Sequence, residues 1–242
     1  MIVAASTHCF HQLPLKEALD KLGDLEYSAV EITIHEGSGQ LEPRHVLANL
    51  EKAVVTCRDT HRLDILAYSV DIKESGAAYY EQFDAICRLA KATKVVTLVV
   101  PSAELGTPFN EEVEHLRRLV DLATLQGTRV SMKTEVGRLS EDPDTVVVLC
   151  DNVHGLGVTL DPSHFVAGPH RGKNLEKLMK YVYHVQLRDS TKDKLQVRIG
   201  QGEVEYGRLI NQLRRHDYDR ALCVDVVEMP DVDHVAEMRK MR

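Results

Sequence analysis

This sequence of 242 residues lacks the features of disulfide-bonded, membrane-spanning and secreted proteins. Its five cysteines are scattered and form no CxxC pair, which favours free, mostly buried thiols in a reducing compartment. No apolar run approaches the roughly 20 residues that a membrane-spanning helix needs. The N-terminal stretch MIVAASTHCF has no basic region and no cleavage-like site, so no signal peptide is predicted. We therefore expect a cytoplasmic protein that does not bind membranes.

The chain has no excess of basic residues. Lys and Arg number 30 against 37 Asp and Glu, which gives a net charge of −7. Nucleic acids and anionic membranes are poor default partners for an acidic chain. The length fits either two small domains or one α/β barrel of about 250 residues. Because no linker-like or low-complexity segment interrupts the chain, we expect a single domain over residues 1–242.

Short apolar runs alternate with segments of helical spacing along the whole chain. Eight strands are predicted, at Ile2 to Ser6, Ala29 to Ile34, Leu63 to Val70, Val95 to Val100, Arg129 to Glu135, Gly155 to Asp161, Tyr183 to Leu187 and Leu222 to Val227. Helices are predicted between and after them, at Leu15 to Leu22, Pro43 to His61, Ala77 to Ala92, Asn110 to Leu125, Pro143 to Asn152, Asn174 to Lys180 and Tyr206 to Arg215, with a last one from near Val232. That last helix has no recognisable C-terminal cap, so we expect the natural chain to continue.

Eight βα units in about 240 residues fit a closed (β/α)₈ TIM barrel, since alternating strands and helices imply a parallel sheet with right-handed crossovers. The alternative is an open doubly wound sheet. That fold needs a glycine-rich phosphate turn after an early strand, and the sequence has neither a GxGxxG motif there nor a Walker lysine motif.

Polar residues stand at the predicted strand ends, where barrel enzymes place their functional groups. Within each strand they alternate with aliphatic residues that suit the surrounding helices, so the polar face is expected to point into the barrel. The residues concerned are His8, Glu31, His35, Lys133, Glu135, Asp161, His184, Gln186, Arg188 and Asp225. Inward carboxylates at this density repel one another unless a cation compensates them. A divalent ion such as Mn²⁺, Mg²⁺ or Zn²⁺ could do so, or Lys133 and Arg188 could neutralise Glu135 and Asp161 without a metal.

Four motifs occur in a familiar order and spacing, namely KTE at 133–135, LDPSH at 160–164, HVQLRD at 184–189 and GQGEV at 200–204. Together they resemble the xylose isomerase-like TIM-barrel superfamily, which contains sugar epimerases and isomerases, inosose dehydratase and apurinic endonuclease IV-type enzymes. The resemblance covers most of the chain and is strongest from Arg129 to Val227. It points to the superfamily more specifically than to any one reaction.

The resemblance implies one divalent ion held by four strand ends, which here carry Glu135, Asp161, Gln186 and Asp225. Two positions depart from the family pattern, because Gln186 stands where a histidine is usual and Asp225 where a glutamate is usual. A glutamine oxygen is a poorer ligand for Zn²⁺ but suits Mg²⁺ or Mn²⁺. The departures imply a weaker metal site, an altered substrate or lost activity. His164 falls on the family's substrate-contacting histidine, and Glu31 on a frequent acid of the second strand.

The resemblance implies a metal-dependent isomerase or epimerase of a small-molecule sugar or sugar derivative. Glu135 and Asp225 would move a proton through an enediolate-like intermediate. The substrate would be held by His164, Arg188, Lys133, Glu31 and His8. Two alternatives stay open: a DNA-repair endonuclease, disfavoured by Gln186 and Gln196 where histidines are wanted, and a non-catalytic ligand-binding barrel. Such barrels often form homodimers, but no interface can be located from the sequence.

Two loop features have two readings each. Gly200-Gln201-Gly202 could cradle a phosphate with its backbone amides, or form a tight turn before the helix at Tyr206. The basic cluster His170, Arg171 and Lys173 could bind a substrate phosphate or lie in a solvated loop.

Overall fold

The protein is a closed barrel of eight parallel strands, each hydrogen-bonded to its neighbours in chain order. A computed structural model describes residues 1–60 and 62–242. The strands are β1 (Ile2–Ser6), β2 (Ala29–His35), β3 (Asp64–Asp71), β4 (Thr97–Pro101), β5 (Arg129–Lys133), β6 (Gly157–Leu160), β7 (Val182–Leu187) and β8 (Ala221–Val224). Pairing of β1 with β8 closes the ring, which excludes the open sheet and confirms the single-domain (β/α)₈ fold.

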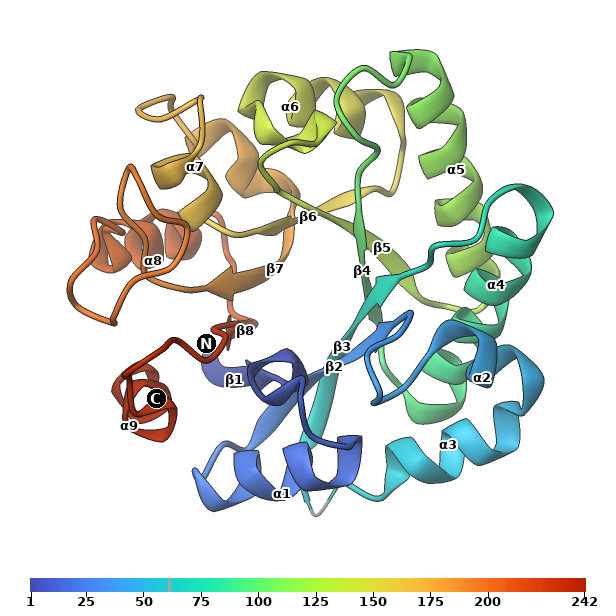
Figure 1. Ribbon diagram of the computed structural model, residues 1–242. Coiled ribbons are helices and arrows are strands. Elements are labelled where there is room, and N and C mark those ends of the chain that lie inside the picture. The colour runs from blue at the N-terminus through green and yellow to red at the C-terminus, as the bar shows by residue number, and fades with distance from the viewer. Residues whose placement is uncertain (61) are drawn as a thin grey trace.

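Helices surround the strands as an outer ring, which Figure 1 shows in a view along the barrel. The α-helices are α1 (Leu15–Asp24), α2 (Pro43–Ala48), α3 (Leu50–Arg58), α4 (Gly76–Thr93), α5 (Phe109–Leu125), α6 (Pro143–Asn152), α7 (Ser163–Ala167), α8 (Tyr206–Arg215) and α9 (His234–Met241). The 3₁₀ segments among the described residues are η1 (Thr7–Phe10), η2 (Leu139–Glu141) and η3 (Glu176–Tyr181). Within the described residues, no helix combines the length and the apolar character needed to cross a membrane.

The predicted helix from Pro43 to His61 is wrong as a single element. Asn49 breaks it with φ −151° and ψ 84°, and its side chain accepts a hydrogen bond from the Lys52 amide at 2.9 Å to start α3. Asparagine favours such a cap over a helix interior because its side chain competes for backbone groups. The predicted end of this helix, His61, lies outside the described residues.

Other predicted bounds and elements also need correction. Strand β5 ends at Lys133 and not at Glu135, and the Thr134 amide makes the last hydrogen bond of its ladder with β6, to the Thr159 carbonyl at 3.0 Å. Strand β8 ends at Val224, so Asp225 stands just beyond it. The segment predicted as a helix at 174–180 is the 3₁₀ segment η3, and the short helix α7 was not predicted.

The interior of the barrel is polar and small, whereas the space between strands and helices is apolar. Hydrogen bonds cross the interior from β7 to β2, where His184 Nε2 and Gln186 Nε2 both reach Glu31. A separate small apolar cluster is formed by Ala4, Ala29, Ala221 and Cys223. Between strands and helices, large side chains such as Tyr68 and Phe83 are fully buried. The alternation read from the sequence therefore places the polar face inward.

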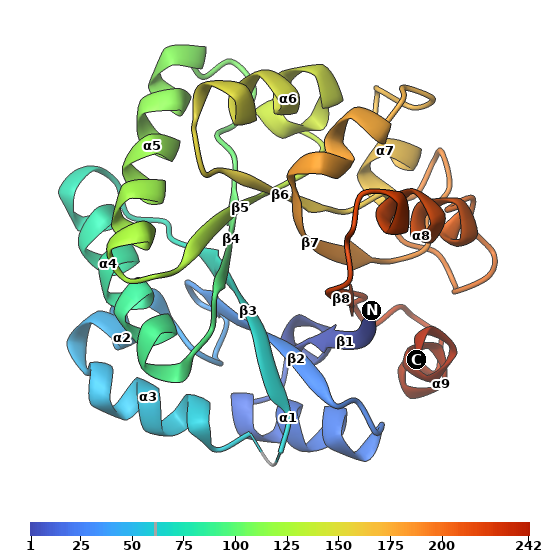
Figure 2. The same cartoon turned by 180° about the vertical axis from the view of Figure 1, so that it is seen from behind.

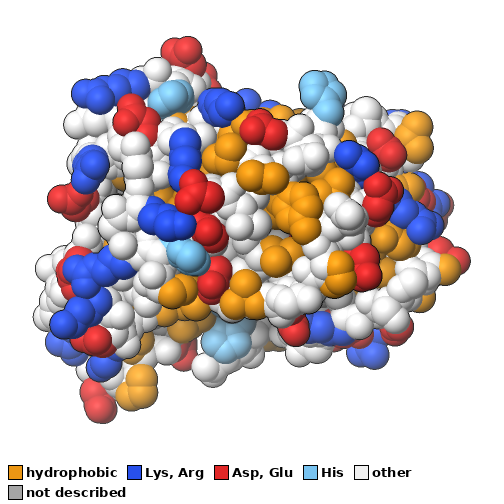
Figure 3. Space-filling model, turned by 90° about the horizontal axis from the view of Figure 1, so that it is seen from above, with side chains coloured by type: hydrophobic (Ala, Val, Ile, Leu, Met, Phe, Trp, Pro, Cys, Tyr) orange, Lys and Arg blue, Asp and Glu red, His pale blue; other side chains and the backbone are white. Residues whose placement is uncertain are grey.

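The last helix packs beside the start of the chain. Tyr27 Oη donates to the Met238 carbonyl at 2.8 Å, and His234 Nε2 lies 2.7 Å from the Cys9 carbonyl. Figure 2, from behind, shows α9 beside β1 with both termini on this side of the barrel. Figure 3 looks onto the ring of helices, where side chains of both charges are mixed and apolar side chains gather in one patch.

Candidate active site at the barrel mouth

Arg188 links two aspartates that follow the strands on either side of its own. It follows β7, and its Nη2 donates to Asp225 Oδ2 at 2.7 Å. Its Nε lies 3.1 Å from Oδ2 of Asp161, which follows β6. All three side chains are buried. Although burial alone would lower the pKa of Arg188, the two aspartates raise it above its ordinary value, so the guanidinium stays charged.

Asp225 has two further partners. His8, in η1 directly after β1, places Nδ1 2.8 Å from Asp225 Oδ1, and Lys133 Nζ lies 3.5 Å from Oδ2. Burial alone would raise the pKa of Asp225, but Arg188, Lys133 and the hydrogen bond from His8 hold it well below its usual range. Asp225 is therefore a permanent carboxylate that anchors other groups, and a weak proton acceptor.

Asp161 is held from its own loop. Its amide donates to Thr134 Oγ1 at 2.9 Å, and its Oδ1 accepts from the Ser163 amide at 3.0 Å and from the Ser163 hydroxyl. This turn follows the end of β6 at Leu160 and leads into α7 at Ser163. Asp161 Oδ2 has no hydrogen-bond partner of good geometry, and Arg188 Nε also lacks one. A ligand hydroxyl could be accommodated by this pair, since one atom accepts and the other donates.

A second polar layer lies below the mouth. Glu31 Oε2 is 2.9 Å from His184 Nε2, and Gln186 Nε2 donates to Glu31 Oε1 at 2.9 Å. Glu31, His184 and Cys223 bring one potential metal-ligating atom each within 4.8 Å of one another. Burial, followed by the charges of Glu31 and Asp225, raises the pKa of Cys223 well above its ordinary value. Metal binding here would require this thiol to release its proton, because the thiolate is the ligating form.

Glu135 lies outside this double layer. Its carboxylate is 3.1 Å from Arg138 Nε, and its side chain is 33% exposed. Arg138 in turn donates to the Ser102 carbonyl at 2.7 Å, which ties the loop after β5 to the end of β4. The charge of Glu135 still acts on Arg188 and on His164. Glu135 is thus the accessible carboxylate at the rim of the mouth.

Two histidines face the mouth in neutral form. His164 accepts a hydrogen bond from the Val136 amide on Nδ1, and its Nε2 lies 3.6 Å from Asp161 Oδ2. Burial lowers its pKa. Burial lowers the pKa of His35 to about 4, and its Nε2 lies 3.1 Å from Ser69 Oγ. Both rings are therefore uncharged hydrogen-bonding groups at neutral pH.

The glycine motif GQG cradles a carboxylate of the chain itself. Asp189 Oδ2 accepts from the amides of Gly200 at 2.8 Å and Gly202 at 3.0 Å, and Oδ1 accepts from the Ser190 amide at 3.1 Å. A side chain at Gly202 would collide with Asp189, because a Cβ would stand 1.9 Å from Oδ1. The motif was predicted from the sequence, but its partner Asp189 was not. Asp189 could have been considered, because a nest of backbone amides binds any anion, including a carboxylate of the same chain.

Gln196 fastens the same loop to the end of β8. Its Nε2 donates to the Val227 carbonyl at 2.7 Å, and its Oε1 accepts from the Val227 amide at 2.9 Å. Both amide atoms are therefore occupied by backbone. This places Gln196 in a structural role and away from the chemistry of a zinc cluster.

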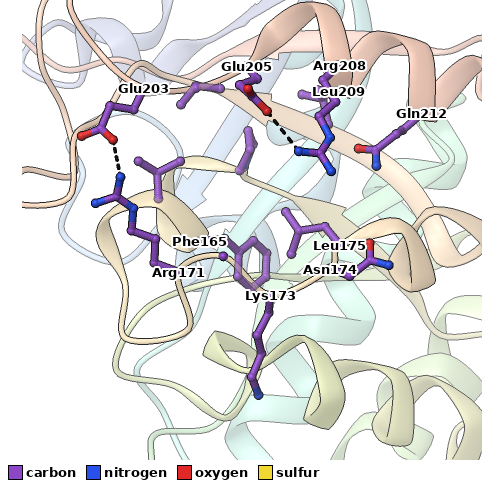
Figure 4. A pocket seen from close by; sticks show the side chains of 14 residues that line it. Phe165, Arg171, Lys173, Asn174, Leu175, Glu203, Glu205, Arg208, Leu209 and Gln212 are labelled. Carbon is purple, nitrogen blue, oxygen red and sulfur yellow. Dashed lines mark hydrogen bonds and ion pairs between the residues drawn. The ribbon is translucent and has the colours of Figure 1, made fainter.

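The basic cluster at 170–173 is neutralised by carboxylates. Lys173 Nζ lies 2.7 Å from Asp142 Oδ1, His170 lies near Glu141, and Arg171 pairs with Glu203. Arg171 and Lys173 border a cavity of about 330 Å³ beside α7 and α8, which Phe165 and Leu209 line with apolar surface. Figure 4 shows the Arg171–Glu203 and Arg208–Glu205 pairs at its rim. These ion pairs favour the reading of a solvated loop over that of a phosphate site.

The four predicted metal ligands do not fit a divalent ion as they are arranged here. Glu135 is paired with Arg138, and the guanidinium of Arg188 stands against both Asp161 and Asp225. Gln186 directs its amide nitrogen, which cannot ligate, at Glu31, and its buried Oε1 has no hydrogen-bond partner. A metal ion among these groups would meet a fixed positive charge.

Solved structures with the same fold are similar to this chain at low sequence identity. A D-tagatose 3-epimerase-like protein has a TM-score of 0.77 and 17% identity, over 100% of this chain and 95% of that one. A xylose isomerase-like TIM-barrel protein from Mycobacterium smegmatis in complex with magnesium has a TM-score of 0.77 and 14% identity, over 99% and 94%. The IOLI protein with a bound zinc atom has a TM-score of 0.74 and 17% identity, over 100% and 96%. Other matched structures are those of a 3-keto-D-glucoside 4-epimerase, a D-psicose 3-epimerase and an L-ribulose 3-epimerase.

The family assignment comes from the sequence as well as from the fold. No curated protein sequence matches the chain. The family model described as the xylose isomerase-like TIM barrel matches residues 15–241, which is nearly the whole barrel. The chain therefore belongs to the xylose isomerase-like TIM-barrel family.

Proposed function

We propose that this barrel is an isomerase or epimerase of a sugar or sugar derivative, acting by proton transfer at a carbon next to a carbonyl. The observation that carries the proposal is the gathering of His8, Lys133, Asp161, Arg188 and Asp225 at the C-terminal ends of the strands. Barrel enzymes place their reacting groups there. The family, and the epimerases among the matched structures, support a sugar as the substrate class.

Glu135 is the first proton-transferring group in this proposal. It is the accessible carboxylate at the rim, and its single ion pair with Arg138 leaves room for a substrate contact. A positioned carboxylate that removes the proton beside a carbonyl contributes typically 10²–10⁴-fold to the rate. Lys133, 19% exposed, is placed to stabilise the negative charge that develops on the substrate oxygen.

His8 is the second proton-transferring group. Its Nδ1 is bound to Asp225, which fixes the ring and leaves Nε2 as the nitrogen for a substrate proton. The sequence pointed to Asp225 as the partner of Glu135. Its buried position and its three cationic or donating neighbours suit it better to orient His8. Asp161 Oδ2, Arg188 Nε and His164 would bind substrate hydroxyls.

Deuterium exchange tests this proposal without knowledge of the product. A panel of ketoses and aldoses, with and without phosphate, is incubated with the protein in D₂O, and loss of the proton signal next to the carbonyl is followed by NMR. We expect exchange with at least one sugar. Glu135→Gln is expected to slow it by about 10²–10⁴-fold, while the exposed control Glu114→Gln leaves it unchanged.

A non-catalytic ligand-binding barrel is the second candidate. The observation that favours it is the saturation of Asp161 and Asp225 by the chain's own cations, which leaves fewer groups free for proton transfer. Sugar binding by calorimetry with no exchange across the panel would support this function. Exchange at the wild-type rate in Glu135→Gln would remove Glu135 from its proposed role.

A further inference from the structure

Arg188 makes the contacts that a cation between two aspartates would make. Its side chain is 9% exposed, and it contacts Asp161 at 3.1 Å and Asp225 at 2.7 Å from two different nitrogen atoms. The aspartates follow β6 and β8, on either side of the strand that carries Arg188. Because a guanidinium cannot lose its proton in a protein, this positive charge is permanent.

The charges around Arg188 are already balanced. Asp225 also meets Lys133 at 3.5 Å and accepts from His8 at 2.8 Å. Two buried carboxylates thus face two fixed cations. A divalent ion would add two positive charges to a group that has no uncompensated negative charge, at contact distance from the guanidinium.

The backbone around Arg188 is held firmly. The next residue, Asp189, is bound by the amides of Gly200 and Gly202, and the Val197 amide donates to the Asp189 carbonyl at 2.9 Å. Gln186, two residues earlier, is fixed to Glu31. Arg188 therefore extends from a segment anchored on both sides, so its guanidinium is directed at the aspartates by the fold.

We propose that Arg188 takes the place of a divalent cation in this barrel. The mouth then works without a metal: Arg188 and Lys133 supply the positive charge that attracts an oxygen-rich ligand. Replacing Arg188 by an apolar residue would turn Asp161 and Asp225 into a metal site. This inference concerns the mouth itself and does not rest on the proposed function, so the failure of one leaves the other standing.

Manganese binding tests the proposal without a substrate. Mn²⁺ is titrated into wild type, Arg188→Met and the double variant Arg188→Met/Asp161→Asn, and free Mn²⁺ is followed by electron paramagnetic resonance. At an effective dielectric constant of about 20, loss of a unit charge about 4 Å away changes the affinity for a singly charged ion by roughly a thousandfold, and the effect on a divalent ion is larger. We expect Arg188→Met to bind one equivalent at least about a thousand times more tightly than wild type, and the double variant to lose that gain.

The control is Arg129→Met, which removes an arginine from the start of β5, where it stacks on Tyr183. It is expected to bind Mn²⁺ as wild type does. Two results would overturn the proposal: tight Mn²⁺ binding by wild type that Asp161→Asn abolishes, or no gain of affinity in a folded Arg188→Met. Should Arg188→Met fail to fold, the comparison of wild type with Asp161→Asn still decides the matter.

Discussion

Glu112→Gln should change how the stability of this barrel depends on pH. Glu112 lies in the first turn of α5 with 1% of its surface exposed, and its Oε1 accepts from the Ala103 amide at 3.0 Å. Burial raises its pKa from 4.5 to about 7, against the opposing effects of the Ala103 hydrogen bond and the charge of Arg138. The folded protein therefore binds this proton more tightly than the unfolded chain does.

The sign and the size follow by linkage. The contribution of protonated Glu112 is fully present below the unfolded pKa and is lost as the pH rises through about 7. The difference between about 7 and 4.5, at 1.36 kcal/mol per pKa unit, corresponds to about 3 kcal/mol. Because glutamine cannot ionise, the variant does not lose this stability as the pH rises. We expect the free energy of unfolding of Glu112→Gln, relative to that of wild type, to rise by about 3 kcal/mol from pH 4.5 to pH 8.

Urea unfolding followed by circular dichroism at a series of pH values measures this difference directly. Glu114→Gln, on the same helix with a 73% exposed side chain, is the matched control and should show no such trend. A constant difference between Glu112→Gln and wild type across this range would refute the reasoning. It would mean that Glu112 ionises in the folded protein as it does in the unfolded chain.

Two further changes test the contacts of the mouth. In Gly202→Ala the new methyl would collide with Asp189, so we expect the free energy of unfolding to fall by about 1–3 kcal/mol. The control Gly207→Ala, with open space around it in α8, should raise it by about 0.5–1 kcal/mol. Equal unfolding midpoints for the two variants would contradict the binding of Asp189 by the glycine amides. Asp225→Asn removes a partner of buried Arg188 and should cost about 3–5 kcal/mol in chemical denaturation. Wild-type stability in that variant would show that the ion pair is dispensable.

The sequence predicted the barrel because the strand pattern is carried by local residues. The run from Ile2 to Ser6 and the helix from Pro143 to Asn152 have the predicted bounds, and Asp142 caps that helix by accepting from the Asp144 amide. The break at Asn49 was missed because helical spacing continues on both sides of it. The capping side chain of Asn49 separates the two helices despite that spacing, and hydrophobic periodicity carries no information about such a cap.

The inward face was predictable for the same reason, but the partners on it were not. Alternation places Lys133, Arg188 and Asp225 on the polar side of their strands, and it allows either a metal or an ion-pair network. Whether a metal site or an ion-pair network forms depends on which side chains are long enough to meet across the barrel. Glu135 turned out to lie past the end of β5 beside Arg138, where a loop contact decides its direction. Such contacts join segments far apart in the chain.

Closure of the ring makes assembly depend on the two ends of the chain. Strand β1 pairs with β8 through the matches Ile2 to Ala221 and Ala5 to Val224. A ribosome makes the first of these strands long before the second, so β1 waits with one edge open while most of the protein is synthesised. Its contacts with β8 are among the most distant in sequence, which makes this pairing a slow and late event in folding. Damage to the last strand would therefore expose the first.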